Sequence, residues 1–126
     1  MSRILIVDDS PTDTYVARKC AEALFSEVRS VGDAEGVFKE LQDYPPDLCL
    51  MDVSLFDVKN GISIISEIRE LEGGSEMLPI VVCSARGTPA DKMIAANAGA
   101  SFYIVKPITP EALAEAVAAL RPGLLP

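Results

Sequence analysis

The sequence predicts an α/β fold, a doubly wound five-stranded parallel sheet with five helices. Short apolar runs alternate five times with stretches of helical periodicity. Strict alternation of strands and helices favours a parallel sheet. Three of the apolar runs are nearly continuous, which is typical of strands covered by helices on both faces. The 126 residues suffice for one domain with one core.

The five expected strands are short and separated by helix-length stretches. They cover residues 3–8, 27–31, 47–51, 79–83 and 101–105. The second of them, EVRSV, is the most polar. We therefore expect the second strand at an edge of the sheet, where one side faces solvent.

Apolar residues that recur every three or four positions predict the helices. The helices lie near residues 11–25, 34–42, 61–72, 89–98 and 110–120. In the first, Val16, Cys20 and Leu24 are expected on one face. In the third, the expected face comprises Ile62, Ile65, Ile68 and Leu71.

Three helix starts share a hydroxyl N-cap followed by proline at the first helical position. These pairs are Ser10-Pro11, Thr88-Pro89 and Thr109-Pro110. Asp13 and Asp91 stand three residues after the first two caps and predict capping boxes, with Asp in place of Glu. Asp33 is the expected cap of the second helix.

The last helix is expected to end before Pro122, because Pro122 and Gly123 cannot extend it. We expect residues 1–122 to form the domain and residues 123–126 a short tail, with no output domain. The start carries no signal sequence, and no apolar run is long enough to span a membrane. These observations predict a cytoplasmic protein.

Composition excludes several functions. The net charge of −8 argues against direct binding of nucleic acid or an anionic membrane. Three cysteines at isolated positions are expected as buried thiols, not disulfides or zinc ligands. Histidine is absent, which excludes histidine-based catalysis and metal sites. The remaining reactive groups are carboxylates, hydroxyls and lysines.

Polar side chains stand at the carboxyl ends of four expected strands. They are Asp8 and Asp9, then Asp52, Ser84 and Lys106. Carboxyl ends of parallel strands meet at one edge of the sheet, so these residues are expected in one cleft. Three carboxylates there repel one another unless a cation joins them, and oxygen ligands favour Mg²⁺. Mg²⁺ with Lys106 would neutralise a phosphoryl group in transfer to a carboxylate.

Each of these residues alone has a simpler explanation. Paired acids before a helix can serve its N-terminus, and Asp52 can be an ordinary loop acid. Ser84 can be a turn residue and Lys106 a solvated lysine. Their arrival at four separate strand ends with compatible chemistry favours a single functional site.

The motifs IVDDSP, CLMDVS, VVCSA and YIVKP, in this order, resemble the receiver domain of two-component response regulators, as in chemotaxis regulators. The resemblance covers about residues 3–120. It implies a flavodoxin-like fold with strand order 2-1-3-4-5. It also implies a phosphorylation-dependent switch in a phosphorelay that is no enzyme in the ordinary sense, although it assists its own phosphotransfer and autodephosphorylation.

The resemblance also implies a role for each motif residue. Asp52 is the implied phosphoacceptor. The implied Mg²⁺ ligands are Asp8, Asp9, Asp52 and the backbone carbonyl of Ser54. Lys106 and Ser84 are implied to bind the phosphoryl group.

Three further positions follow from the same resemblance. Tyr103 is the implied aromatic switch residue, which turns inward when Ser84 moves. Ser54 and Arg86 occupy positions that tune the lifetime of the phosphorylated state. The Lys106-Pro107 bond is a candidate for the cis isomer, which X-Pro bonds can adopt.

The implied partners are a sensor histidine kinase or phosphotransfer protein as donor and a downstream protein as target. The target would bind the face made by the fourth helix, fifth strand and fifth helix, and a homodimer is also open. The segment from Asp52 to Gly61 is one residue longer than the family pattern, and Phe56 replaces its usual proline. This departure leaves a phosphorylation-independent docking module as an alternative. A phosphatase is a weaker alternative, because Ser54 stands where a second acid is needed.

Overall fold

The computed structural model describes residues 2–53, 60–72 and 77–125 of the chain. Strands and helices alternate throughout. The strands are β1 (Arg3–Val7), β2 (Glu27–Val31), β3 (Leu48–Asp52), β4 (Ile80–Ser84) and β5 (Phe102–Val105). The helices are α1 (Pro11–Glu22), α2 (Ala34–Asp43), α3 (Gly61–Glu72), α4 (Pro89–Ala98) and α5 (Pro110–Leu120), followed by the 3-10 turn η1 (Pro122–Leu124). The expected elements are all confirmed, with small shifts at their ends.

One parallel sheet joins the five strands in the order β2-β1-β3-β4-β5, which confirms the expected topology. β3 and β4 are buried along their whole length. β2 lies at an edge of the sheet and is only partly buried, as its polar sequence predicts. The order in which strands are added to the sheet reverses between β1 and β3, and parallel sheets bind ligands in the crevice at such a point.

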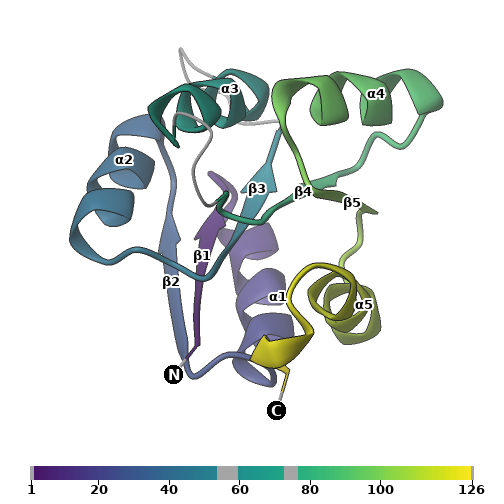
Figure 1. The fold of residues 1–126 in the computed structure, drawn as a ribbon. Helices are drawn as coiled ribbons and strands as arrows, with labels where there is room; N and C mark the ends of the chain where they lie inside the picture. The colour runs from purple at the N-terminus through teal and green to yellow at the C-terminus, as the bar shows by residue number, and fades with distance from the viewer. Residues whose placement is uncertain (1, 54–59, 73–76, 126) are drawn as a thin grey trace.

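Helices cover both faces of the sheet (Figure 1). α1 and α5 pack on one face through the buried side chains Ala17, Cys20, Ala21, Leu113, Ala116 and Val117. α2, α3 and α4 pack on the other through Val37, Ile64, Ile65, Ile68 and Ala95. The three cysteines are buried free thiols, as expected.

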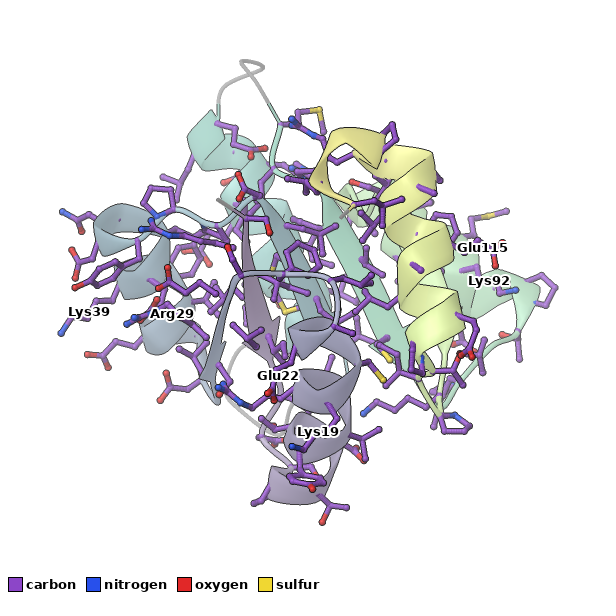
Figure 2. All side chains as sticks on the ribbon, turned by 90° about the horizontal axis from the view of Figure 1, so that it is seen from below. Lys19, Glu22, Arg29, Lys39, Lys92 and Glu115 are labelled. Atoms are coloured by element: carbon purple, nitrogen blue, oxygen red, sulfur yellow. The ribbon has the colours of Figure 1, made fainter. Side chains whose placement is uncertain are left out.

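The outer surfaces of the helices carry charged side chains. Figure 2 shows Lys39 of α2 beside Arg29 of the edge strand β2 on one flank, Lys19 and Glu22 on α1, and Lys92 of α4 with Glu115 of α5 on the opposite flank. None of the helices that the structure describes is both long and apolar enough to cross a membrane.

The expected helix faces are partly wrong. In α3, Leu71 is 72% exposed and Ile64 is fully buried in its place. Each step of three residues turns a helix back by about 60°, so Ile62 and Leu71, three such steps apart, lie on opposite sides. In α1, Val16 is 39% exposed, whereas Ala17 is buried.

The helix caps follow the predicted pattern with one exception. Thr88 and Asp91 form the expected capping box at α4, and Thr109 caps α5. At α1, Ser10 accepts a hydrogen bond from the backbone N–H of Asp13, but the Asp13 carboxylate does not return to the cap. The capping box predicted for Ser10 and Asp13 is therefore only half formed.

The last helix ends at Leu120, as the proline and glycine that follow predict. The next residues then make the turn η1, and Leu124 and Leu125 pack against the core beside α5. The described part of the expected tail is thus attached to the hydrophobic core.

Truncation of Ile68 to alanine should lower the free energy of unfolding by about 2–5 kcal/mol, because its side chain is only 3% exposed. Leu71→Ala in the same helix should change it by less than about 0.5 kcal/mol, because Leu71 is exposed. Urea unfolding of both variants measures the difference. Equal losses would contradict this orientation of α3.

Candidate functional site

Four strand ends converge at one edge of the sheet. Asp8 follows β1, and Asp52 and Ser84 end β3 and β4. The register pairs Val7 with Met51 and Asp52 with Cys83, so Asp8 and Asp52 lie level on neighbouring strands. After β5, the backbone N–H of Lys106 donates to the carbonyl of Ser84 at 2.7 Å. The expected convergence of these residues is confirmed.

Among the described residues, three carboxylates form an acidic centre at the strand ends. Oxygen atoms of Asp8, Asp9 and Asp52 lie within 4.8 Å of one another. Asp8 is 8% and Asp52 4% exposed, whereas Asp9 is exposed. A hard cation that takes oxygen ligands fits this donor set, because it accepts several carboxylates and keeps water on its open side.

The start of α3 approaches the end of β3 very closely. A Cβ atom on Gly61 would lie 2.6 Å from the backbone oxygen of Asp52. Only glycine allows this approach, so the glycine that the sequence places after the loop helps to hold the backbone at Asp52. Ser54 and Phe56 lie outside the described residues.

Lys106 is the residue of the described part of the chain that brings an ammonium group to the site. Its Nζ atom lies 2.8 Å from Asp13, 3.4 Å from Asp8 and 3.6 Å from Asp52. Burial lowers the pKa of Lys106, but the hydrogen bond to Asp13 and the attraction of Asp52 outweigh it and raise the pKa above its usual value. Lys106 is therefore charged at neutral pH. The Lys106-Pro107 peptide bond is cis, as considered from the sequence.

Asp13 is the site residue that the sequence interpretation missed. Its position after Ser10 predicts a capping role, yet its carboxylate is the nearest acid to Lys106. The available signal was its place one helical turn after the paired acids, on the helix that starts at the carboxyl edge of the sheet.

The surroundings of Asp8 disfavour its charged form. Burial raises the pKa of Asp8 to about 6, and the neighbouring charge of Asp52 adds to this effect. The backbone N–H of Ser10, which donates to Asp8 at 2.9 Å, and the charge of Lys106 act in the opposite direction. Without a metal ion, the acidic centre is therefore under electrostatic strain.

Ser84 and Tyr103 both bond to the backbone of Arg86. Ser84 is 1% exposed and its Oγ accepts from the Arg86 N–H at 3.1 Å. The Tyr103 hydroxyl donates to the Arg86 carbonyl at 2.5 Å, and the tyrosine packs against the core on the α2–α4 face. The Arg86 guanidinium turns away and bonds Asp91 at 3.2 Å.

A cavity of about 390 Å³ lies beside Asp52. Its polar end is lined by Asp8, Asp13, Asp52 and Lys106, and its remaining lining includes Val16, Cys83 and Ile108. Burial raises the pKa of Cys83 to about 12, so this thiol is not a nucleophile at neutral pH. A carboxylate is the reactive group that the cavity offers.

The chain matches the family model described as "Response regulator receiver domain" over residues 4–118. It is 34% identical to chemotaxis protein CheY of Thermotoga maritima, covering 91% of this chain and 93% of that one. It is 31% identical to protein PilH of Pseudomonas aeruginosa, covering 98% of this chain and all of that one.

A longer relative is transcriptional regulatory protein KdpE of Mycobacterium tuberculosis, which is 31% identical over 96% of this chain. The chain spans only about half (52%) of the KdpE length. Among solved structures, chemotaxis response regulator CheY4 of Vibrio cholerae shares the fold with a TM-score of 0.82 and 24% identity, covering 94% of this chain and 98% of that one. A LuxR-family two-component response regulator from Aurantimonas sp. gives 0.83 and 27%, covering 98% and 86%.

Asp8→Asn should stabilise the metal-free protein by about 1–2 kcal/mol near neutral pH, because it removes the strained carboxylate. The amide oxygen can still accept from Ser10. In the wild type, the folded state binds this proton more tightly than the unfolded state, so the strain is relieved as the pH falls through about 6. The advantage of the variant should therefore shrink towards about pH 5.

Urea unfolding in the presence of a chelator at the two pH values measures this effect. Asp43→Asn, at an exposed position at the end of α2, controls for the change in net charge. An Asp8 variant less stable than the wild type at neutral pH would refute the assigned strain.

Proposed function

Because the chain belongs to the response regulator receiver domain family, we propose that it is a phosphorylation-dependent switch of a two-component phosphorelay that accepts a phosphoryl group on Asp52. The observation that carries the proposal is the Asp52 carboxylate, buried at the end of β3 within 3.6 Å of the Lys106 ammonium group. Asp8 and Asp9 beside it supply the remaining acids.

The proposed donor is a phosphohistidine of a sensor kinase or phosphotransfer protein. One Asp52 oxygen attacks the phosphorus atom in line, and the bond from phosphorus to the donor imidazole nitrogen breaks. The electron pair stays on the imidazole, which then takes a proton from solvent. Lys106 pairs with the phosphoryl oxygens, and the Ser84 hydroxyl can turn to donate to one of them.

Mg²⁺ is the proposed cofactor, held by Asp8, Asp9, Asp52 and the backbone carbonyl of Ser54. The three carboxylates gathered within 4.8 Å support this assignment for the described residues. When bound, the ion would offset the negative charge that accumulates around the transferred group. The ends of β1 and β3 hold the three acids in place, and this placement does not depend on which protein donates the phosphoryl group.

The switch step follows from the shared bonds to Arg86. When Ser84 turns to the phosphoryl group, it can no longer keep its present bond to the Arg86 N–H in the same geometry. The Arg86 carbonyl also holds the Tyr103 hydroxyl. The N–H and the carbonyl of Arg86 lie in two successive peptide units, on either side of one Cα atom. Movement of the backbone at Arg86 would therefore couple the phosphoryl group to Tyr103, and the shift between states can be no larger than the difference in these contacts.

The proposed output surface is the face of α4, β5 and α5. Three large apolar side chains are exposed on α4 and β5, namely Met93, Ile94 and Val105. Exposed apolar groups of this kind suit binding of a downstream protein or a second copy of the chain. Residues 1–122 are proposed as the receiver unit, which acts through protein contact and without direct binding of nucleic acid.

Arg86 and Ser54 are the positions proposed to set the lifetime of the acyl phosphate. Arg86 extends towards Asp91 and its side chain is 78% exposed. Because the Arg86 guanidinium is turned towards Asp91, the proposed route by which the switch returns to the resting state is hydrolysis of the acyl phosphate by water.

Incubation with Mg²⁺ and acetyl phosphate should add one phosphoryl group to the wild type and none to Asp52→Asn. Intact-mass spectrometry measures the addition. Beryllofluoride gives a stable analogue of the phosphorylated state, and its binding can be followed by NMR, because the chain has no tryptophan for fluorescence. Asp43→Asn is the matched control, because it is an exposed acid outside the site. Equal modification of the wild type and Asp52→Asn would exclude Asp52 as the phosphoacceptor.

Asp9→Asn should weaken Mg²⁺ binding by about tenfold or more, since it removes one of the few charged ligands. The Ser10 N–H donates to Asp8 and the Ser10 hydroxyl accepts from the Asp13 N–H, so both of these bonds at the start of α1 remain possible in the variant. Mg²⁺ titration followed by NMR shifts at the strand ends measures the affinity. Unchanged affinity would remove Asp9 from the metal site.

A further inference from the structure

Two helix starts in this chain have the same sequence pattern but place their acids differently. At α4, Asp91 Oδ2 accepts hydrogen bonds from both the N–H and the hydroxyl of its cap, Thr88. At α1, the equivalent acid, Asp13, makes no such return bond and reaches Lys106 at 2.8 Å. A purely structural capping role explains Asp91 and does not explain Asp13.

Asp8 is the reason for the difference. Its Oδ1 atom accepts the backbone N–H of the α1 cap, Ser10, at 2.9 Å. This is the donor that Asp13 would bind in a capping box. With that donor satisfied, the Asp13 carboxylate is directed to the site, where it remains favoured by its place in the first turn of α1.

The Lys106 ammonium group therefore lies beside three carboxylates, and the nearest of them is not that of the proposed phosphoacceptor, Asp52. Nζ lies 2.8 Å from Asp13, and Asp52 is 3.6 Å away. Lys106 is only 17% exposed, while Asp13 at 46% lies at the rim of the cavity. The lysine is thus drawn towards α1 in this state.

We propose that Asp13 is a positioning residue that holds Lys106 in the resting state and competes with the phosphoryl group for its ammonium group. The inference rests on the function proposed above. For Lys106 to pair fully with a phosphoryl group, its bond to Asp13 must break. The energy of the resting pair then opposes the phosphorylated state and sets how much donor is needed to populate it.

The test compares beryllofluoride titrations of the wild type, Asp13→Asn and Asp13→Glu at Mg²⁺ concentrations shown to saturate each variant. Asp13→Asn should bind about three- to tenfold more tightly, the range of a partly exposed charged pair. Asp13→Glu keeps the carboxylate and should stay within about twofold of the wild type. Asp43→Asn should have no effect, because it changes only the net charge.

The Lys106→Met background separates an effect through the lysine from simple removal of negative charge. There, Asp13→Asn should no longer change the affinity, because the proposed competition has no ammonium group to act on. An unchanged effect in that background, or an Asp13→Asn affinity equal to that of the wild type, overturns the inference.

A second measurement follows the resting contact without any phosphoryl analogue. The Lys106 ammonium signal in NMR should be protected from proton exchange with water in the wild type and lose that protection in Asp13→Asn. Protection that does not depend on Asp13 overturns the inference, even where beryllofluoride binds normally. Absence of beryllofluoride binding in the wild type, with Asp13-dependent protection intact, would instead refute the proposed function and with it the competition.

Discussion

The structure depends on an imbalance of charge at one edge of the sheet. Among the described residues, Asp8, Asp13 and Asp52 surround the ammonium group of Lys106, and Asp9 lies beside them. Such a cluster is unfavourable by itself, because burial and, to a smaller extent, the charge of Asp52 raise the pKa of Asp8. It is tolerated because the strand ends hold the acids rigidly against two hydrophobic layers that supply the stability of the fold.

The two layers explain why the cluster stays in place. β3 and β4 are buried along their whole length between α1 and α5 on one side and α2, α3 and α4 on the other. Asp52 is the last residue of such a strand, so its backbone cannot retreat from the neighbouring charges. The close contact of Gly61 with the Asp52 carbonyl restricts it further. Rigid placement of like charges is also what gives a cation its affinity for such a site.

The sheet order was predicted from the resemblance to receiver domains. The helix positions and the convergence of Asp52, Ser84 and Lys106 could be predicted from the residues themselves, because they follow from periodicity and from the geometry of parallel strands. The sequence did not determine the position of a side chain where two local interactions were both favourable. Asp13 has a valid capping role in sequence, and only the bond from Ser10 to Asp8 decides against it. Leu71 continues an apolar pattern, yet its place around the helix axis leaves it exposed.

A similar competition between partners concerns the two groups proposed to bind the phosphoryl group. Ser84 is bonded to the Arg86 N–H, and Lys106 lies nearest to Asp13, so both groups proposed to bind a phosphoryl oxygen have another partner in this structure. A new dianion on Asp52 would have to attract both away. Each existing bond is strong enough to define the resting arrangement and weak enough to be exchanged for a charged one. A switch built in this way needs no large rearrangement of the core, because the exchanged bonds lie at the strand ends and in the loop that carries Arg86.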